Sequence, residues 1–516
     1  MNVYKKLLEQ LAIRPDATAI IDTKGDSVRH TSFAQLVHQI EQAAANLERQ
    51  GIYNGDTVLL LHGLSLELYV ALLALLKIGA TAMIIDPSMP ADALKRCCQI
   101  AQPKAIIGGA KGLVFALFNQ DLRSIPRRIG LSRILRSSHG ELSETFIAWP
   151  ETPALITFTS GSTGIPKAIC RSHQFLLDQH DALHNALNLQ SSSLQLVTLP
   201  VFALANLASG VTSVLPNTDI SLPGQVNARA ITNYIQTTGV TEILASPAFV
   251  ERLCDHALAR RRAFPTIERI FTGGAPVLPR SYRNMQEIFP RATIYGVYGS
   301  TEAEPIAKIN LEEISAEDME AMSNGAGLLA GYSESSVQLA IVDSNWQPTA
   351  EQQHLDLKAH ALGVRQVGEI IVAGRHVVKS YLNAAQNAES KIHITGDTLK
   401  PTVWHRTGDA GYLDEQGRLW LLGRVSARID DEFGVLYPLA CEAQVIEQTA
   451  VKRAAILNRG SMRTMVIESR DRAASPALRR IASRAHIQRI VFVDRLPVDK
   501  RHNSKIDYRA LHKVLS

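Results

Sequence analysis

The strongest constraint on the fold is an alternation of short β-rich runs with longer helical stretches. The runs VLLL at 58–61 and TAMIID at 81–86 flank a helical stretch at 66–78, and AIIG at 105–108 follows a second helical stretch near 92–101. Strands joined by helical crossovers form parallel, layered sheets. The pattern therefore predicts an α/β fold. Further strands are expected at 154–159, 194–200, 242–245, 268–274 and 292–299.

The predicted secondary structure changes after Gly368. The runs GEIIVAG and GYLDEQGRLWLLGR follow, and the DEQG core of the second is typical of a hairpin turn between antiparallel strands. We therefore place a domain boundary near Gly423, which divides the chain into a large domain at 1–423 and a small domain at 424–516.

Charge argues against a nucleic-acid partner. The net charge of the 516 residues is only +5, which is too dilute for a nucleic-acid footprint. Arginines cluster at 123–136, 260–262 and 479–484, without the interleaved aromatic side chains that would stack on bases. We interpret the clusters as solvated faces; contact with an anionic membrane or a carrier protein is the alternative.

Cysteine usage and hydropathy indicate a cytoplasmic protein. The five cysteines have no C-x-x-C spacing, which is typical of a reducing compartment. The N-terminus lacks the apolar core of a secretory signal. The most apolar span, 58–86, is interrupted by His62, Glu67 and Lys77, so we expect no transmembrane segment.

A Ser/Thr/Gly-rich loop follows the strand at 154–159. It reads TSGSTGIPK and comprises Thr159, Ser160, Gly161, Ser162, Thr163, Gly164, Ile165, Pro166 and Lys167. Its glycines allow backbone N–H groups and hydroxyls to face a polyphosphate together, and Lys167 adds a positive charge. The spacing is not that of a P-loop, because Pro166 precedes the lysine and prevents a helix start there. A flexible surface turn is the alternative interpretation.

Four further motifs follow the loop in order. They are YGSTEAEP at 298–305, GEIIVAGRHVVKSYLN at 368–383, HRTGDAGYLDEQGRLWLLGR at 405–424 and LPVDKRHNSKIDYRAL at 496–511. Together the five motifs resemble the adenylate-forming superfamily, which includes acyl-CoA synthetases, nonribosomal adenylation domains and luciferases. Within it, IIDPSM, LPVFAL, ASPA, CEA and PVDKRHNSKI are most similar to olefin β-lactone synthetases.

The resemblance implies a large N-terminal domain of layered sheets and a small, mobile α+β C-terminal lid, with the active site between them. The implied reaction joins a carboxylic acid to AMP with loss of pyrophosphate, using ATP and Mg²⁺. Lys167 and the loop hydroxyls would hold the β- and γ-phosphates, and Glu302 would hold Mg²⁺ through oxygen ligands.

The resemblance also assigns the nucleoside and the catalytic groups. Tyr298 would stack on adenine, bordered by Gly273, Gly274, Ala275, Pro276 and Gly299. Asp409 would accept hydrogen bonds from the ribose hydroxyls, and Arg424 would reach phosphate or ribose. Lys505 would be the catalytic cation of the lid, acting with Thr301 and Glu302. Read alone, a strand tyrosine, a turn aspartate and a tail lysine are ordinary structural residues.

Departures from the thioester-forming pattern bear on the second step. Ser426 stands where those relatives place an acidic or lysine hinge residue, Ser504 replaces a glycine, and Ala203 follows Phe202 where many relatives have a gating histidine. These differences argue against a generic acyl-CoA ligase. The resemblance to olefin β-lactone synthetases implies instead that the substrate's own 3-hydroxyl attacks the adenylate and closes a β-lactone without a thiol. Transfer to CoA or to a carrier-protein thiol is one alternative, and an inactive nucleotide-binding scaffold is another.

The acid is expected to be an apolar 3-hydroxy fatty acid. The segment at 200–211, which includes Phe202 and Ala203, supplies apolar lining without a charged anchor, although it reads equally well as core. His173, His376 and His502 are candidates for the base that activates the hydroxyl. A carrier protein or a neighbouring biosynthetic enzyme is a conceivable partner.

Overall fold

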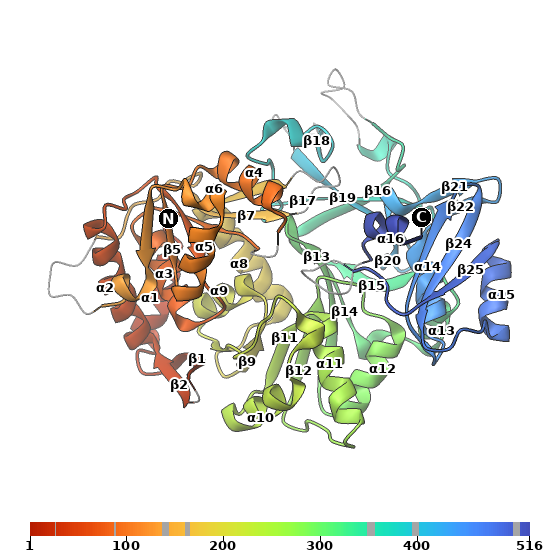
Figure 1. Ribbon diagram of the computed structural model, residues 1–516, viewed down its shortest axis with the longest axis horizontal. Helices are drawn as coiled ribbons and strands as arrows, with labels where there is room; N and C mark the ends of the chain where they lie inside the picture. Colours follow the sequence, from red (N-terminus) through yellow and green to blue (C-terminus); the bar gives the residue numbers. More distant parts are fainter. Residues whose placement is uncertain are drawn as a thin grey trace. The chain divides into compact units, whose positions relative to one another are not determined.

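The computed structural model describes residues 1–25, 27–86, 89–136, 144–159, 166–347, 357–394, 402–498 and 506–515. The chain divides into two compact units. The first comprises 1–220, 226–245 and 378–388, and the second comprises 221–225, 246–377 and 389–516. Figure 1 labels the helices and strands of both.

The first unit contains the predicted parallel sheet. Its strand order is β6-β5-β3-β4-β7-β8, and neighbours are parallel except for the antiparallel pair β7–β8. The strands are β3 (Thr57–Leu61), β4 (Thr81–Ile84), β5 (Ala105–Gly108), β6 (Arg127–Gly130), β7 (Pro153–Thr159) and β8 (Lys167–Ser172). The crossover expected at 66–78 is helical, so the βαβ prediction is confirmed.

A second group of strands in this unit runs in the order β11-β9-β10-β1-β2. Its members are β1 (Thr18–Lys24), β2 (Ser27–Ser32), β9 (Leu194–Val197), β10 (Thr212–Val214) and β11 (Glu242–Ala245). The carboxylate of Glu242 is buried, and it accepts hydrogen bonds from Ser193 Oγ at 2.5 Å and Gln195 Nε2 at 3.0 Å. The pairing satisfies a charge that would otherwise destabilise the interior.

Helices surround these sheets (Figure 1). They are α1 (Tyr4–Ile13), α2 (Phe33–Arg49), α3 (Leu66–Lys77), α4 (Ala91–Ala101), α5 (Ala110–Phe118), α6 (Gln120–Arg123), α7 (Leu131–Ile134), α8 (His173–Leu187), α9 (Pro200–Ser209) and α10 (Ala228–Thr238), with the 3₁₀ turn η4 (Ala384–Gln386). Helix α3 is apolar almost all round and is buried along its whole length, as such a sequence requires. Ser65 caps it by accepting a hydrogen bond from the backbone N–H of Leu68.

The second unit is built on a mainly antiparallel sheet of order β16-β17-β19-β20-β15-β14-β13-β12, with β18 beside β19. Its strands are β12 (Arg269–Gly273), β13 (Thr293–Ser300), β14 (Ala303–Asn310), β15 (Leu328–Ser333), β16 (Val337–Val342), β17 (Gly368–Gly374), β18 (Lys391–Ile394), β19 (Thr402–Leu413) and β20 (Leu419–Arg424). The predicted DEQG hairpin joins β19 to β20. Gly417 in its turn has φ +77°, a left-handed conformation that glycine adopts without strain.

The remaining elements of this unit include two small sheets. They are β21 (Ile429–Asp431), β22 (Gly434–Leu436), β23 (Val451–Arg459), β24 (Met462–Ser469), β25 (Arg489–Val493), α11 (Pro247–Leu258), α12 (Pro279–Ile288), α13 (Ala316–Ser323), α14 (Pro438–Ile446), α15 (Pro476–Arg484), α16 (Tyr508–Leu515), η1 (Pro223–Gln225), η2 (Leu311–Glu313), η3 (Leu357–Ala359) and η5 (Val425–Ala427). Both sides of the expected boundary at 423/424 belong to this unit, and the boundary stays a prediction.

Candidate active site

A tight hairpin turn presents the predicted Thr301 and Glu302. Ser300 at the end of β13 pairs with Ala303 at the start of β14, so Thr301 and Glu302 are the two residues of the turn. Side chains in a two-residue turn lie at the end of the sheet rather than on one of its faces. The turn therefore places Thr301 and Glu302 at this end of β13, and their catalytic and metal-binding roles stay predictions.

Three predicted residues form one hydrogen-bonded cluster in the second unit. Asp409 on β19 lies opposite Arg424 on β20. Its Oδ1 accepts a hydrogen bond from Arg424 Nη1 at 2.8 Å, and its Oδ2 accepts one from the Tyr298 hydroxyl at 2.9 Å. Arg424 Nη1 also donates to the carbonyl of Thr407 at 3.1 Å. The structure thus brings Tyr298, Asp409 and Arg424 together.

Burial and charge in this cluster keep the Tyr298 phenol protonated. Burial, with the nearby Asp409 carboxylate, holds the pKa of Tyr298 well above its usual value, so the phenol stays protonated and donates. The Asp409 carboxylate raises the pKa of Arg424, and Glu302 adds to the effect. Glu302 therefore lies within electrostatic reach of the same arginine. Each oxygen of Asp409 retains capacity for a further donor such as a ribose hydroxyl.

The glycine pair at the end of β12 is required by the backbone around it. A Cβ at Gly273 would collide with the carbonyl of Val297 on the neighbouring β13, so only glycine fits there. Gly274 has φ +81° and turns the chain toward Ala275 and Pro276. A Cβ at Gly274 would meet no other atom nearby, and the adenine-binding role of these residues stays a prediction.

Two hydroxyls that the sequence did not single out lie on the same strands. Thr272 Oγ1 on β12 and Ser300 Oγ on β13 are buried without a hydrogen-bond partner among the described residues. Buried hydroxyls without a partner are unfavourable, so a bound water or a polar group of a ligand is expected to satisfy them. The donors and acceptors at these strand ends therefore fit a nucleotide. Thr272 immediately precedes the glycine pair, which is the signal that could have identified it.

The first unit holds the base of the predicted phosphate loop. Thr159 ends β7 and pairs directly with Lys167, the first residue of β8, so the loop connects two antiparallel strands and no helix follows it. This differs from a P-loop, as expected. Ser160, Gly161, Ser162, Thr163 and Gly164 lie outside the described residues. Their phosphate-binding roles remain predictions.

Tyr381 is a neighbour of Lys167 that sequence reasoning missed. The ammonium of Lys167 lies 5.1 Å from the centroid of the Tyr381 ring, a cation–π contact. The backbone N–H of Leu382 donates to the carbonyl of Ala168 at 3.0 Å, and Gln386 Nε2 donates to the carbonyl of Pro166 at 3.2 Å. The end of the 368–383 motif thus supports β8 and positions its lysine.

Phe202 and Ala203 are buried on α9 in the first unit. Their burial suits both interpretations made from the sequence, acid lining and core. Their role as substrate-binding residues stays a prediction.

Lys505 lies outside the described residues, as do His502 and Ser504. The residues on either side of that stretch are paired: Val498 bridges Ile506 in antiparallel fashion, and the backbone N–H of Asp507 donates to the carbonyl of Pro497 at 3.0 Å. Helix α16 then begins at Tyr508, whose hydroxyl donates to the buried Glu442 carboxylate at 2.5 Å. Val498 and Ile506 are therefore held side by side.

Two of the histidines proposed as bases are described. His173 is fully buried, and its Nδ1 accepts a hydrogen bond from the backbone N–H of Val3 at 3.2 Å. Burial lowers the pKa of His173 to about 4. A ring packed against the first residues of the chain is poorly placed to take a proton from a substrate. His376 is also buried, and its Nε2 lies 3.1 Å from the carbonyl of Pro305.

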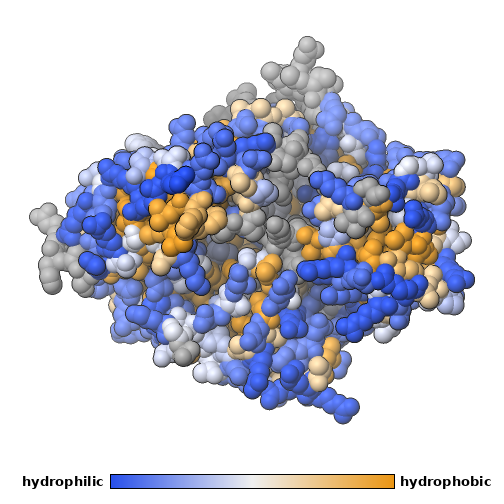
Figure 2. Space-filling view, viewed as in Figure 1, coloured by the Kyte–Doolittle hydropathy of each residue, from blue (hydrophilic) through white to orange (hydrophobic). Residues whose placement is uncertain are grey.

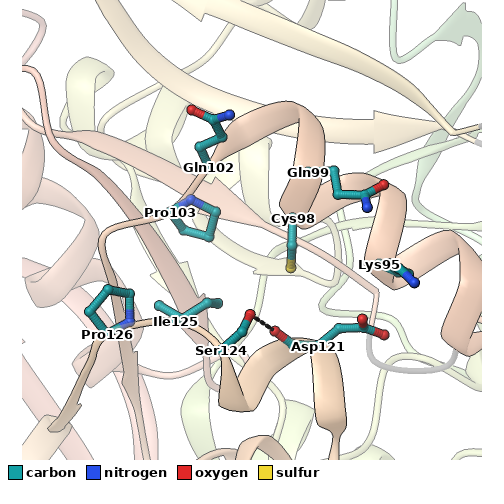
Figure 3. Close-up of a pocket in the computed structure, with 9 residues that line it drawn as sticks. All are labelled: Lys95, Cys98, Gln99, Gln102, Pro103, Asp121, Ser124, Ile125 and Pro126. Carbon is teal, nitrogen blue, oxygen red and sulfur yellow. Dashed lines mark hydrogen bonds between the residues drawn. The ribbon is translucent and has the colours of Figure 1, made fainter.

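A surface hollow of about 400 Å³ in the first unit contains none of the predicted site residues. It lies between α4 and α6, where the Ser124 hydroxyl donates to the carbonyl of Asp121 (Figure 3). Its polar side chains Lys95, Gln99 and Gln102 lie at the rim and are exposed to solvent. The hollow therefore gives no support to an acid-binding role.

Magnesium binding requires little from the chain itself. The described residues contain no group of three or more His, Cys, Asp or Glu side chains arranged to hold a metal. Mg²⁺ that is bound through nucleotide phosphates needs only one or two carboxylates and keeps several waters. The single carboxylate of Glu302 at the hairpin turn fits that requirement.

The fold and these strand-end residues define an adenylate-forming enzyme. The chain belongs to the AMP-binding enzyme family, whose model matches residues 7–382. It is a ligase or synthetase that activates an acid as its adenylate, and the recognition made from the five motifs is confirmed.

Similar proteins support the same class. The olefin beta-lactone synthetase of Stenotrophomonas maltophilia (strain K279a) is 33% identical over 501 residues, covering 92% of this chain and 89% of the relative. The olefin beta-lactone synthetase of Xanthomonas campestris pv. campestris is 30% identical over 505 residues, with the same coverage of 92% and 89%. The solved O-succinylbenzoate coenzyme A synthetase of Bacillus subtilis, in complex with ATP and magnesium ion, has a TM-score of 0.79 at 20% identity and covers 98% of this chain and 99% of that chain. That structure confirms the predicted fold.

No helix in the described part of the chain is both long and apolar enough to cross a bilayer.

Proposed function

We propose that this enzyme activates a 3-hydroxy fatty acid with ATP and Mg²⁺ and then closes the acyl adenylate to a β-lactone. The observation that carries the proposal is the 33% identity to an olefin beta-lactone synthetase along nearly the whole of both chains. The cluster of Tyr298, Asp409 and Arg424, with Glu302 in electrostatic reach, supplies the groups that nucleotide binding requires.

In the first step a carboxylate oxygen of the acid bonds to the α-phosphorus of ATP, and the bond from that phosphorus to the bridging oxygen of pyrophosphate breaks. Asp409 holds the ribose through its carboxylate oxygens, and Arg424 offsets negative charge at the phosphates. Lys167, seated on Tyr381, grips the outer phosphates, and Lys505 stabilises the charge of attack. Glu302 would hold the magnesium ion, which screens the phosphates when bound.

In the second step the 3-hydroxyl oxygen bonds to the acyl carbon, and the bond between that carbon and the AMP oxygen breaks. The hydroxyl proton leaves to a base or to the departing phosphate. An internal nucleophile has a high effective concentration, so the reaction needs no second substrate. Ser426 lies in the turn η5 after Arg424. It stands where thioester-forming relatives have an acidic or lysine hinge residue, and this difference supports a reaction without a thiol.

The experiment compares two acids of equal chain length, one with a 3-hydroxyl and one without. Both should release pyrophosphate, because adenylation uses only the carboxylate. Only the hydroxylated acid should give AMP and a product lighter than the acid by one water, as measured by mass spectrometry without CoA. If product accumulates from either acid only after CoA or a carrier-protein thiol is added, the lactone proposal is wrong and thioester formation replaces it.

A further inference from the structure

Helix α5 exposes an apolar face to solvent. Val114 is 51% exposed, Leu117 is 50% exposed and Phe118 is 88% exposed. Their spacing places them on one side of the helix, together with Lys111 one turn earlier. Figure 2 shows a hydrophobic area over α5 with hydrophilic residues around it. Contiguous apolar side chains on a surface mark a contact site.

The outward orientation of this face is fixed by packing. A Cβ at Gly112 would collide with the carbonyl of Leu61 on β3, so this side of α5 lies directly against the sheet. Ala116 is fully buried, and Leu113 lies beside Gly130 at the end of β6. With its inner side occupied in this way, α5 has no freedom to rotate its exposed apolar side chains inward.

The residues that follow α5 concentrate the positive charge of the protein. Residues 110–136, all described, contain six basic side chains and one acidic one, a net charge of +5 that equals the net charge of the whole chain. The other residues are therefore electrically balanced. The six cations are Lys111, Arg123, Arg127, Arg128, Arg133 and Arg136.

Among the described residues, these cations have no carboxylate within salt-bridge distance. Across the described ranges of the chain, none of the six forms a salt bridge. Arg127 donates instead to the carbonyls of Gln50 and Gly51. The charge is thus available to an external anion.

An apolar helix face that is followed along the chain by a run of basic side chains fits the chemistry of an anionic lipid surface. The apolar side chains enter the boundary between headgroups and acyl chains, while arginine and lysine remain at the phosphates. A nucleic acid would need aromatic stacking groups interleaved with the arginines, but none lies among Arg123–Arg136, and Phe115 and Phe118 belong to α5. The hydrophobic core of a protein–protein interface is depleted of charge, which fits less well.

We propose that the α5 surface, formed by residues 110–136, binds the headgroup region of an anionic lipid bilayer. This role goes beyond acid activation and holds whichever acid the enzyme uses. Such binding would bring the enzyme to the place where apolar acids partition.

Vesicle flotation with the full chain tests the proposal. The protein should float with vesicles of phosphatidylcholine mixed with phosphatidylglycerol and much less with phosphatidylcholine alone. Binding to the anionic vesicles should fall as salt is raised, because the cations are exposed and screened. We expect Phe118→Ser and the pair Arg123→Glu with Arg133→Glu each to weaken binding on the order of tenfold.

Matched variants in other parts of the chain separate this surface from general stickiness. Tyr332→Ser removes a comparably exposed aromatic side chain, which is 51% exposed. Arg260→Glu with Arg262→Glu reverses a second arginine cluster that is also exposed. Both should float like the unaltered protein. Thermal unfolding of every variant checks that it is folded. The salt dependence of flotation is measured on the unaltered protein, so it tests the proposal even where a variant fails to fold.

Three outcomes overturn the proposal. The first is an unaltered protein that stays with the dense fraction in the presence of anionic vesicles at low salt. The second is equal loss of flotation in the α5 variants and the matched variants. The third is a dimer of the unaltered protein that Phe118→Ser converts to monomer, because the apolar face would then be covered by a second copy.

Discussion

The hydroxyl of Tyr298 donates a hydrogen bond of 2.9 Å to Oδ2 of Asp409, although 111 positions separate the two residues along the chain. The bond joins the YGSTE motif to the TGD motif. It orients the carboxylate while Arg424 holds the other oxygen. Two motifs that lie far apart in the sequence therefore form one hydrogen-bonded cluster.

Tyr298→Phe should weaken ATP binding and leave KM for the acid unchanged. Loss of one neutral donor to a charged carboxylate is worth about 1–2 kcal/mol, so we expect KM for ATP to rise roughly five- to thirtyfold. Pyrophosphate release at varied ATP measures the change. Tyr412→Phe is the matched control, because it removes a tyrosine hydroxyl bonded at 2.9 Å to the carbonyl of Ala326 in the same unit. A similar rise in both variants would mean that the effect is structural.

Glu302→Gln should raise the Mg²⁺ concentration needed for half-maximal adenylation by about tenfold, since a neutral amide is a weaker ligand for a hard cation. Titration of pyrophosphate release with Mg²⁺ measures it. Glu312→Gln, on the exposed turn η2, should leave the titration unchanged. An unchanged midpoint in the Glu302 variant would remove this residue from the metal site.

Lys505→Ala should reduce the first step by at least about a hundredfold, because a cation at the reacting phosphate stabilises charge that develops in the transition state. Single-turnover formation of the acyl adenylate measures that step directly. Lys500→Ala lies in the same 499–505 stretch and should retain activity. Equal losses in the two variants would point to disruption of the stretch rather than to a catalytic lysine.

Glu442 should make the stability of the protein depend on pH. Burial raises the pKa of Glu442 to about 7 from an ordinary value of 4.5. A raised carboxyl pKa favours the folded state fully below 4.5, and this contribution is lost as pH rises through about 7. Glu442→Gln has no such titration, so its stability relative to the unaltered protein should increase between pH 5 and pH 8.

The size of that relative gain is about 3 kcal/mol at most. Urea unfolding at several pH values, followed by circular dichroism, measures it. Tyr508→Phe serves as a comparison, because it removes the hydroxyl that bonds Glu442 but leaves a titrating carboxyl in place. Parallel pH curves for the Gln variant and the unaltered protein would contradict the assignment.

The sequence predicted the sheets because their signals are local. The runs at 58–61, 81–86 and 105–108 alternate with helices, and parallel pairing follows from that order. The turn between β19 and β20 was equally predictable, because Asp and Gly in DEQG favour a tight turn that reverses the chain direction. The motif order also identified the family, since five ordered motifs leave little room for chance.

The contacts that complete the site could not be predicted from the sequence, because they join segments that are far apart along the chain. Nothing near Lys167 indicates that the ring of Tyr381 lies beside it. The buried hydroxyls of Thr272 and Ser300 look ordinary in a strand sequence, and only the packing around them reveals that they lack partners among the described residues. Sequence patterns could not exclude His173 either, because its burial against Val3 depends on the tertiary fold.

The bridge between Val498 and Ile506 has an evolutionary consequence. Val498 and Ile506 pair with each other, and Tyr508 ties the start of α16 to the buried Glu442. Substitutions at Val498, Ile506 or Tyr508 are therefore restricted by packing in this unit, independently of any role in catalysis.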